Sequence, residues 1–281
     1  MKILILGANS CVGSRLYLEL SQYHVVLGTF HNNKILEDLV QLDVTDRNAV
    51  LKLITKEKPE VIIHCANNAS SKSCEENPEL AVAVNQEATK YIAEAANSIN
   101  AKLVYISSFA AFSHEDVYGK TKYESEQITK NTNAGYLIIQ PGIILGMSPK
   151  IKKENGFFSS LIENIDENIP AKYDNIKKSQ PTYLGHICEV IKLALDRNIW
   201  NRAIPVATPE LKTKYEMATD IISSFGIKVE ETEGIKPQVT KFPKEMSELK
   251  ELNLPECTYN QMIEKVISEI KIGKSKNKLN G

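Results

Sequence analysis

Tyr118 and Lys122 stand four residues apart in the stretch VYGKTKYESE, residues 117–126. On a helix this spacing places both side chains on one face. A phenol is a poor acid or base at neutral pH, and a neighbouring ammonium group stabilises its phenolate. The two residue types therefore suit a proton-transfer site. Tyr173 and Lys177 repeat the spacing in a chain with 11 tyrosines, so the surrounding elements must decide between the two pairs.

The first half of the chain alternates short apolar runs with longer segments of helical spacing. The apolar runs are 2–7, 24–29, 39–42, 61–66, 102–107 and 136–141. The helical segments are 12–22, 46–58, 78–99 and 119–131. Strands that are apolar throughout are buried on both faces, which is typical of a parallel sheet covered by helices. The order of elements predicts an α/β fold, a Rossmann-type doubly wound parallel sheet.

The second half has a looser pattern, with helical segments separated by loops that contain proline. These helical segments are 157–168, 185–197, 214–226 and 259–270. We interpret this half as a smaller C-terminal substrate lobe at the carboxyl ends of the strands, where open α/β sheets bind ligands. The expected division is a dinucleotide-binding domain over 1–145, the lobe over 146–270 and a flexible lysine-rich tail over 271–281.

The first strand ends in GANSCVG, residues 7–13, and a helix follows. The first glycine permits a tight turn, the last allows close packing of helix on strand, and the helix N-terminus attracts a pyrophosphate. Ser10 replaces the usual middle glycine; its Cβ narrows the approach of a phosphate, and its hydroxyl can donate a hydrogen bond instead. The residues predicted to bind a dinucleotide here are Gly7, Asn9, Ser10, Cys11, Val12 and Gly13.

The second strand ends in GTFHNNK, residues 28–34, which contains no carboxylate. An acidic residue at this point binds the adenosine ribose of NAD and repels the 2′-phosphate of NADP. Its absence favours NADP(H) over NAD(H). His31, Lys34 and Arg15 are candidates to face the phosphate, with ordinary loop residues as the alternative.

The third strand leads into LDVTD, residues 42–46. Asp43 and Val44 are predicted to contact the adenine, with Asp43 facing its amino group. Asp46 equally suits the N-cap of the next helix.

Composition narrows the class of protein. Hydrophobic residues make up 42% of the 281 residues, charged residues 25%, and the formal net charge is -1. These values predict a sizeable core and give no basic field for nucleic acid or a membrane surface. The five cysteines form no C-x-x-C pair, which argues against zinc and disulfides, so no metal is expected. Without a signal peptide or an apolar segment near 20 residues, we expect a cytoplasmic protein.

Several motifs occur in an order that resembles a known family. They are GANSCVG, LDVTD, KPEVIIHCAN, NPELAVAVNQEATKYIAEAA, KLVYISS, YGKTKYESE and QPGIILG. In this order they are similar to the extended short-chain dehydrogenase/reductases, and within them to the dTDP-4-dehydrorhamnose reductase (RmlD-like) group. The resemblance covers roughly residues 1–200 and continues faintly in FPKEMSELKELNL.

The resemblance implies a role for each member of the first tyrosine pair. Ser108, which closes the fifth strand, matches the catalytic hydroxyl, Tyr118 the acid/base and Lys122 its partner, which also binds the nicotinamide ribose. No strand with a terminal serine precedes Tyr173, so we interpret its spacing as chance. The implied activity is reduction by NAD(P)H of a keto group on a nucleotide-activated deoxysugar, in cell-surface polysaccharide synthesis.

The same resemblance implies further positions around the cofactor. Cys65, Ala66 and Asn67 follow the fourth strand and are expected to line the site by backbone, as is His64, which lacks a second ligand for a metal. Asn85 is expected to support the active-site backbone, and Pro141 resembles the turn above the nicotinamide. Candidates for the substrate lobe are Phe157, Thr182 and Tyr183.

Two departures from the family pattern leave alternatives open. The group usually has Asp and Tyr after the catalytic hydroxyl, where this chain has Phe109 and Ala110, and Ser10 is the second departure. A sugar-nucleotide epimerase or dehydratase of the same fold is one alternative. The other is a non-catalytic, NADP-binding regulatory subunit, because a relative of this group serves methionine adenosyltransferase in that way. A homodimer is the usual assembly of such proteins.

Overall fold

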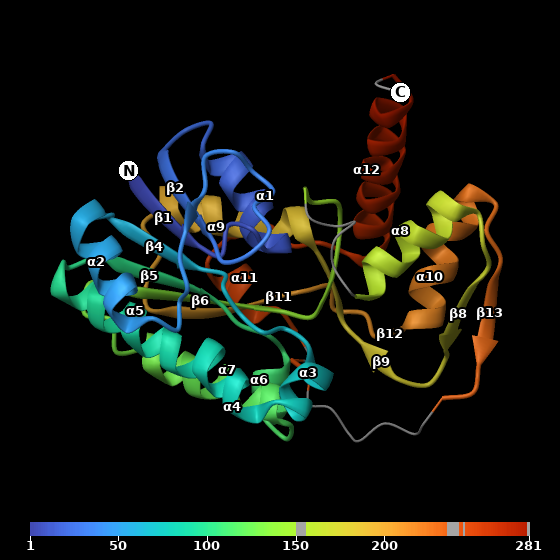
Figure 1. Ribbon diagram of the computed structural model, residues 1–281. Helices are drawn as coiled ribbons and strands as arrows, with labels where there is room; N and C mark the ends of the chain where they lie inside the picture. Colours follow the sequence, from blue (N-terminus) through green and yellow to red (C-terminus); the bar gives the residue numbers. More distant parts are fainter. Residues whose placement is uncertain (150–155, 235–241, 244, 280–281) are drawn as a thin grey trace. The chain divides into compact units, whose positions relative to one another are not determined.

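The computed structural model describes residues 1–149, 156–234, 242–243 and 245–279 (Figure 1). The chain divides into two compact units. Unit 1 comprises Met1–Pro141 and Cys188–Pro205, and unit 2 comprises Gly142–Ile187 and Val206–Gly281. The chain therefore leaves the first unit once and returns to it for a helix and a strand.

Unit 1 is built on a seven-stranded sheet with the order β11-β6-β5-β4-β1-β2-β3. Its strands are β1 (Lys2–Leu6), β2 (Val25–Phe30), β3 (Val40–Gln41), β4 (Val61–His64), β5 (Lys102–Ile106), β6 (Tyr136–Pro141) and β11 (Arg202–Val206). All neighbours among the first six pair in parallel; Ile3, for example, lies between Val26 and Val61. The strand order reverses between β1 and β4, so the predicted Rossmann-type doubly wound sheet is confirmed.

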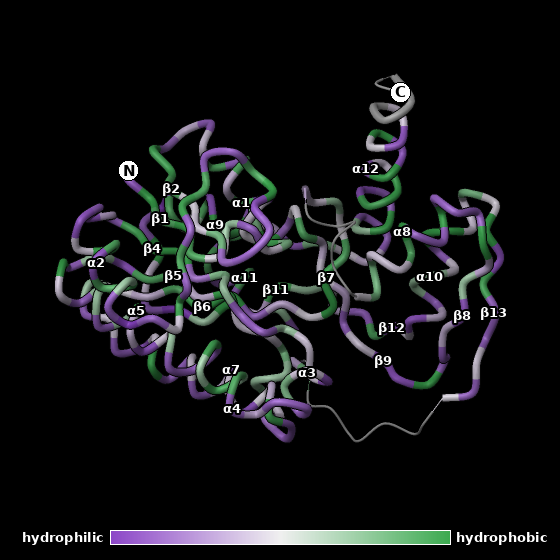
Figure 2. The backbone as a smooth tube through the Cα atoms, in the orientation of Figure 1, coloured by the Kyte–Doolittle hydropathy of each residue, from purple (hydrophilic) through white to green (hydrophobic). Residues whose placement is uncertain are grey.

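The central strands are buried along nearly their whole length. Every residue of β4 is buried, and only the first residue of β1, β5 and β6 is partly exposed. Figure 2 shows hydrophobic residues concentrated in these strands. Helices cover both faces of the sheet, which is why the strand sequences are apolar throughout.

The helices of unit 1 begin in different ways, several of them at a side-chain N-cap. They are α1 (Cys11–Leu20), α2 (Arg47–Glu57), α3 (Ser71–Glu76), α4 (Pro78–Ala81), the π-helical segment η1 (Val82–Glu87), α5 (Ala88–Ser98), α6 (Ala110–Ser113) and α7 (Val117–Thr129). A ninth, α9 (Leu184–Asp196), enters from unit 2. Ser10, Asp46 and Asp116 each accept a hydrogen bond from the backbone N–H three residues on, so Asp46 is a helix N-cap.

The helix predicted over 78–99 is continuous in the chain but irregular in structure. Its middle, Val82–Glu87, forms a π-helix between two α-helical parts. A π turn holds one more residue than an α turn, and such turns are frequent at functional sites. Asn85 lies within this segment.

Unit 2 has short strand pairs and a helical core. Its paired strands are β7 (Ile143–Leu145) with β10 (Pro181–Tyr183), β9 (Lys178–Ser179) with β12 (Lys212–Thr213), and β8 (Ala171–Asp174) with β13 (Val229–Thr232). Its helices are α8 (Phe157–Glu167), α10 (Lys214–Ile222), the 3-10 turn η3 (Ser223–Phe225), α11 (Ser247–Glu251) and α12 (Tyr259–Leu279). Leu161, Met217, Ile221 and Met262 are fully buried in one hydrophobic cluster of this unit.

Helix α12 extends through Leu279, over a segment whose lysine content predicts a flexible tail. The lysines there are good helix formers, and the segment follows without a break the apolar face that buries Met262, Val266 and Ile270. A helix already nucleated by packing can be extended at small cost.

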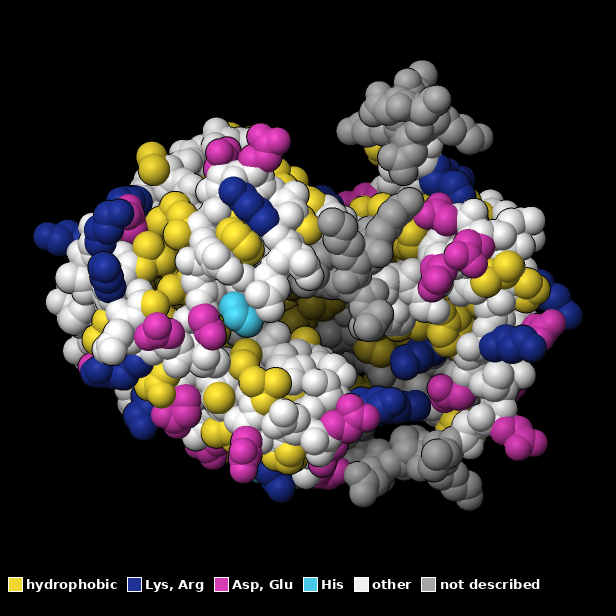
Figure 3. All heavy atoms as spheres, in the orientation of Figure 1, with side chains coloured by type: hydrophobic (Ala, Val, Ile, Leu, Met, Phe, Trp, Pro, Cys, Tyr) yellow, Lys and Arg dark blue, Asp and Glu magenta, His cyan; other side chains and the backbone are white. Residues whose placement is uncertain are grey.

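Within the part of the chain that the structure describes, no helix is long and apolar enough to cross a membrane. In the same residues no cluster of three or more metal-ligating side chains occurs. On the face shown in Figure 3, acidic and basic side chains are interspersed over the surface.

Candidate active site

The loop between β1 and α1 requires both of its glycines. Gly7 has a φ of +80°, and a Cβ added there would lie 2.6 Å from the backbone nitrogen of Ala66. A Cβ on Gly13 would lie 2.2 Å from the carbonyl oxygen of Gly7. Gly7 thus lets the loop approach the chain after β4, and Gly13 lets α1 start directly against the loop.

Ser10 is the N-cap of α1. Its Oγ accepts a hydrogen bond from the Gly13 N–H at 3.0 Å, and its φ of -80° is one that any residue adopts. The serine therefore stabilises the start of the helix, which explains how it replaces a glycine here. Its hydroxyl hydrogen remains a donor for a phosphate beside the first turn of α1, where N–H groups lack intrahelical partners.

Asn9 shapes the loop that follows β2. Its Nδ2 donates to the carbonyl oxygens of Asn32 and Asn33 at 3.1 and 2.9 Å, and its Oδ1 accepts from the Ile35 N–H at 3.1 Å. The side-chain amide is thus occupied by this loop. Asn9 thus positions the segment that carries His31 and Lys34, and its predicted contact with a cofactor stays a prediction.

His31 and Asp43, predicted to contact different parts of a cofactor, lie beside each other. The His31 Nε2 is 3.7 Å from the Asp43 Oδ2, and both side chains are exposed. Partial burial raises the pKa of Asp43, but hydrogen bonds from Thr45 and the nearby His31 outweigh it, so the net pKa is lowered. A carboxylate therefore occupies this edge of the site although the 28–34 segment has none.

The remaining adenosine-side candidates differ in surroundings. The Lys34 ammonium is 5.9 Å from the centre of the ring of Phe30, which is partly exposed. Arg15 is hydrogen-bonded to Glu19, one turn further along α1. Val44 is buried in the core, which leaves its backbone for any cofactor contact.

Cys65, Ala66 and Asn67 extend β4 past the sheet edge. Cys65 is buried, its N–H donates to the Leu6 carbonyl at 2.8 Å, and burial raises the pKa of its thiol to about 12. The Asn67 Oδ1 accepts from the Lys122 ammonium at 2.9 Å. This segment therefore joins the glycine loop to the helix that carries Tyr118.

Asn85 connects that segment to α7 from within the π-helix. Fully buried, it accepts from the Asn68 N–H at 2.7 Å and donates to the Asn68 carbonyl and the Thr121 Oγ1, both at 3.1 Å. Its own carbonyl accepts from the hydroxyl of Ser125 at 2.8 Å. The asparagine thus connects the backbone after β4 to helix α7, and its support of an active site stays a prediction from the family resemblance.

Tyr118 lies in the first turn of α7, and Ser108 follows β5. Both side chains are partly exposed. Burial raises the pKa of the Tyr118 phenol to about 12, against a hydrogen bond with Ser108 that lowers it. The phenol and hydroxyl are thus neighbours, and at neutral pH the phenol carries its proton.

Lys122 is almost fully buried, with 1% of its surface exposed. Its Nζ donates to the Asn67 Oδ1 at 2.9 Å and to the Ile106 carbonyl at 2.6 Å, and it lies 4.3 Å from the centre of the Tyr105 ring. Burial lowers the pKa of this ammonium to about 7, against Glu126, which raises it. A lysine with such a pKa is typical of a functional site.

The second tyrosine pair has no such setting. Tyr173 lies on strand β8, where its hydroxyl donates to the Ser160 Oγ at 3.0 Å, and Lys177 lies in the turn after it. Strand β8 ends at Asp174, so Lys177 lies outside it, and no helix places the two side chains on one face. Within unit 1, Tyr118 lies beside Ser108 and one turn before Lys122 on α7, whereas Tyr173 belongs to unit 2.

A family model described as the RmlD substrate binding domain matches residues 1–264. The chain belongs to this family. A dTDP-4-dehydrorhamnose reductase ortholog from Clostridium acetobutylicum is 25% identical with a TM-score of 0.79 over 98% of this chain and all of the other. The dTDP-4-dehydrorhamnose reductase of Bacillus anthracis, solved with NADP, is 22% identical with a TM-score of 0.77 over 95% and 96%.

A further relative is the subunit of another enzyme and is not named as a reductase. The beta subunit of methionine adenosyltransferase 2 from Bos taurus is 27% identical over 246 residues, which are 80% of this chain and 72% of the subunit. The predicted resemblance to the extended short-chain dehydrogenase/reductases and the RmlD-like group is confirmed. The relatives of this RmlD family member include both enzymes and a subunit of another enzyme.

Sequence reasoning missed three polar residues behind Lys122 in this RmlD family member. Glu126 accepts hydrogen bonds from the Ser107 hydroxyl and from the Gln140 Nε2, the latter at 2.9 Å, and all three are buried. The four-residue spacing of Lys122 and Glu126 was the available signal, since it puts both on one helix face. Ser107 and Gln140 had none, because strands bring them to the helix.

Phe109 lies at the position where the family resemblance implies a polar residue. It is buried, its ring lies 5.4 Å from that of Phe112, and its N–H donates to the Pro141 carbonyl at 2.8 Å. The aromatic residue thus packs into unit 1 next to Ser108. Pro141 contributes its carbonyl to this contact.

The candidates in unit 2 have structural contacts of their own. The buried Thr182 hydroxyl donates to the Val206 carbonyl at 2.6 Å and accepts from the Gly142 N–H at 2.9 Å, and the Tyr183 hydroxyl donates to Glu269 at 2.6 Å. Phe157 stacks edge-on against Tyr173. These contacts fix the strands and helices of unit 2.

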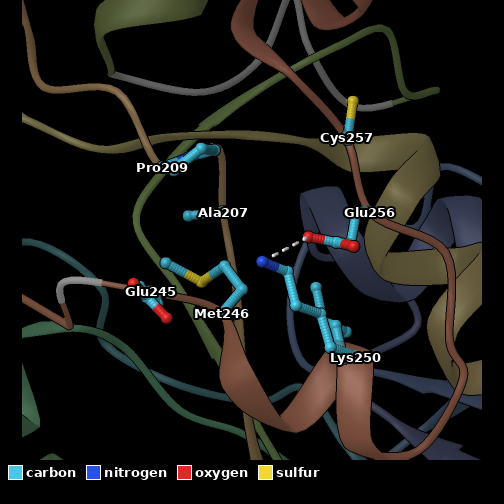
Figure 4. A pocket seen from close by; sticks show the side chains of 8 residues that line it. Ala207, Pro209, Glu245, Met246, Lys250, Glu256 and Cys257 are labelled. Atoms are coloured by element: carbon cyan, nitrogen blue, oxygen red, sulfur yellow. Dashed lines mark ion pairs between the residues drawn. The ribbon is translucent and has the colours of Figure 1, made fainter.

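Unit 2 also holds a small cavity of about 120 Å³ (Figure 4). Its lining includes Met246, Leu249 and Cys257, and the ion pair of Lys250 with Glu256 at 3.8 Å. None of the predicted site residues lines it.

Proposed function

We propose that this protein is an NAD(P)H-dependent reductase of a keto group on a nucleotide-activated deoxysugar, with Tyr118 as the proton donor. The observation that carries the proposal is the buried Lys122 one turn from Tyr118, whose phenol meets the Ser108 hydroxyl. The similarity to two solved dTDP-4-dehydrorhamnose reductases supports this substrate class.

The glycine loop fits the pyrophosphate of a dinucleotide. A Cβ on Gly7 or Gly13 would clash with the backbone of Ala66 or of Gly7, so the two glycines allow the tight turn that brings the first turn of α1 next to the end of β1. Ser10 and the first turn of α1 would hold the phosphates by hydroxyl and N–H donors. NADP(H) is favoured over NAD(H) because residues 28–34 lack a carboxylate and offer His31 and Lys34, and the Bacillus anthracis neighbour was solved with NADP.

The three residues divide the chemistry. When bound, the reduced nicotinamide supplies a hydride to the carbonyl carbon. Ser108 donates a hydrogen bond to the carbonyl oxygen, and Tyr118 transfers its proton to that oxygen as negative charge develops there. Lys122 stabilises the resulting phenolate, and two of its three N–H donors are held by Asn67 and Ile106, which leaves one for a ribose hydroxyl.

A binding subunit is the second candidate. It is favoured by the 27% identity to the beta subunit of methionine adenosyltransferase 2 over 80% of this chain. A chain that serves only as a binding partner needs neither a reducible substrate nor the Tyr118 phenol, so turnover separates the two functions.

The first experiment is a titration with NADPH and NADH, followed by calorimetry and by the fluorescence of the single tryptophan, Trp200. We expect NADPH to bind with a Kd of about 1 μM or below and more tightly than NADH. A screen of 4-keto nucleotide sugars, read as NADPH consumption, follows. Absence of binding of either cofactor would contradict the proposal.

Tyr118→Phe is the decisive variant in that screen. We expect kcat to fall by about 10²–10⁴-fold, the usual contribution of a general acid, while the Kd for NADPH changes by less than about threefold. Tyr123→Phe is the matched control, because Tyr123 is an exposed tyrosine on the same helix. Equal activity of the two variants would rule out Tyr118 as the proton donor.

A further inference from the structure

Glu126 is a buried carboxylate one helical turn after Lys122. Its exposed fraction is 5%, and the four-residue spacing on α7 places it on the same face as Lys122. A buried charge is costly unless a charge of opposite sign and hydrogen bonds compensate it. The proposed mechanism assigns this residue no task.

Two elements of the sheet hold the carboxylate in place. Ser107, directly after β5, and Gln140, in β6, both donate to the same Oε1 of Glu126. Both donors are themselves buried. The carboxylate is therefore fixed relative to the sheet, and the helix position of Lys122 is fixed with it.

The other groups that face Lys122 carry no negative charge at neutral pH. Burial raises the pKa of the Cys65 thiol to about 12, and raises those of Cys74 and Tyr105. Burial lowers the pKa of His64 to about 3, so this ring is neutral. Among these neighbours, Glu126 alone supplies an anion.

We propose that Glu126 is a positioning residue, the buried counter-ion that keeps Lys122 charged and oriented for its work beside Tyr118. The inference rests on the proposed function, because a charged Lys122 is needed where a phenolate must be stabilised. Desolvation alone favours the neutral amine, and the carboxylate one turn away opposes it. Asn67 and Ile106 then direct the ammonium without neutralising it.

The test measures the charge of Lys122 directly. In protein labelled with ¹³C at the lysine ε-carbons, Lys122 is the signal that is lost in Lys122→Met. It should titrate near pH 7, well apart from exposed lysines near 10.4. In Glu126→Gln, which keeps an acceptor for Ser107 and Gln140, we expect this titration about one pH unit lower or more.

Two further variants separate charge from packing. Glu124→Gln, on the exposed side of α7, should leave the Lys122 titration unchanged. Glu126→Asp keeps the charge and changes the shape, so we expect a smaller shift than in Glu126→Gln. An unchanged titration in Glu126→Gln, or equal shifts in the Asp and Gln variants, would overturn the proposal.

Turnover gives the second readout, and it distinguishes failure of this inference from failure of the reductase function. If reduction needs the charged lysine, its rate falls as pH rises through the Lys122 titration. We expect Glu126→Gln to move that limb of the kcat profile to lower pH by the shift seen in the NMR titration, with NADPH affinity within about threefold. If the titration shifts in a protein that reduces no substrate, the electrostatic effect of Glu126 on Lys122 is retained and the reductase function is rejected.

Discussion

At the scale of single residues, the ionisation of Tyr118 and Lys122 is displaced toward neutral forms. The phenol pKa is about 12 and the ammonium pKa about 7, and burial is the largest cause of both shifts. A protonated phenol at neutral pH is the form that a proton donor needs. For Lys122 the same burial is unfavourable, because the ammonium must stay charged in a position where desolvation favours the neutral amine.

The two adjacent serines offer a prediction at this scale. Ser108 faces Tyr118, whereas Ser107 donates to the buried Glu126. Ser108→Ala should lower kcat by about 10²-fold and leave stability nearly unchanged, because its side chain is partly exposed. Ser107→Ala should lower the free energy of unfolding by about 1–3 kcal/mol, because a buried carboxylate loses a donor.

The change in kcat is measured from the rate of NADPH consumption. The change in the free energy of unfolding is measured by urea unfolding followed by Trp200 fluorescence. Trp200 lies in unit 1 together with both serines, so its signal reports on the unit that carries them. Similar kinetic and stability losses in the two variants would show that the serines do not have separate roles.

At the scale of elements, the π-helical segment connects the parts of the site. Asn85 binds both backbone groups of Asn68 and reaches Thr121 on α7. The backbone after β4 is irregular, so the Asn85 amide satisfies polar groups that no strand partner satisfies. The element therefore acts through hydrogen bonds as well as packing.

Asn85→Ala should reduce stability and activity together. It removes the Asn85 partners of the partly buried Asn68 N–H and carbonyl and leaves the Cys74 thiol as a donor to that carbonyl, so we expect a loss of about 1–3 kcal/mol of unfolding free energy. It also frees the segment that carries Asn67, so Lys122 loses a fixed acceptor and kcat falls about tenfold or more. Asn131→Ala, which removes an exposed amide bonded to Gln127, is the matched control. Full activity in Asn85→Ala would contradict this role.

The strands and helices of unit 1 were largely predictable, and the exceptions have physical causes. Uniformly apolar runs predicted β1 to β6, whereas β11 escaped because RAIPV carries an arginine and Pro205 in a short run. The π turn was invisible because its apolar residues continue the helical spacing. The positions of Asn9 and of the His31–Asp43 pair depend on loops, and sequence patterns do not specify the geometry of those loops.

Helix periodicity indicates which side chains of the candidate site share one face of α7, and it applies to Tyr118, Lys122 and Glu126 alike. The family resemblance, and not the spacing, singles out Tyr118 and Lys122. Ser107 and Gln140 reach the helix from β5 and β6 only once the sheet is assembled. Sequence spacing carries no information on such contacts between elements.

At the scale of the whole molecule, a buried histidine couples stability to acid. The Thr89 hydroxyl donates to the Asn85 carbonyl at 2.6 Å, so it must accept from the His64 Nε2 at 3.1 Å. The His64 Nδ1 then faces the core without a partner. The ring is therefore held neutral, and its pKa is lowered to about 3 by burial and by Lys122.

The sign of the pH effect follows from this pKa. An unfolded histidine titrates near 6.5, so between about pH 6.5 and 3 the unfolded chain binds one more proton than the folded chain. The free energy of unfolding is therefore unaffected by the titration of His64 above about pH 6.5. As pH falls from there towards 3, it decreases by about 1.4 kcal/mol per pH unit.

His64→Phe should therefore flatten the acid limb of the stability profile by about that slope. Urea unfolding monitored by Trp200 at pH 7, 6, 5 and 4 gives the comparison, and it stays within the signal of unit 1. His24→Gln, at a partly exposed histidine, should leave the slope unchanged. The same slope in His64→Phe and the parent protein would mean that His64 does not limit acid stability.

The π turn at Val82–Glu87 has a consequence for how this chain can change by insertion and deletion. A π turn is an α-helix with one residue inserted. Removing one residue, such as Ala83, would let α4 and α5 join as a continuous α-helix. Because the wide turn accommodates the extra residue locally, the flanking parts would keep their faces, and the residues of the wide turn, Asn85 among them, would change position. The chain would keep its apolar composition and lose the bond from Asn85 to Asn68, so a single-codon deletion could erase the site while sparing the fold.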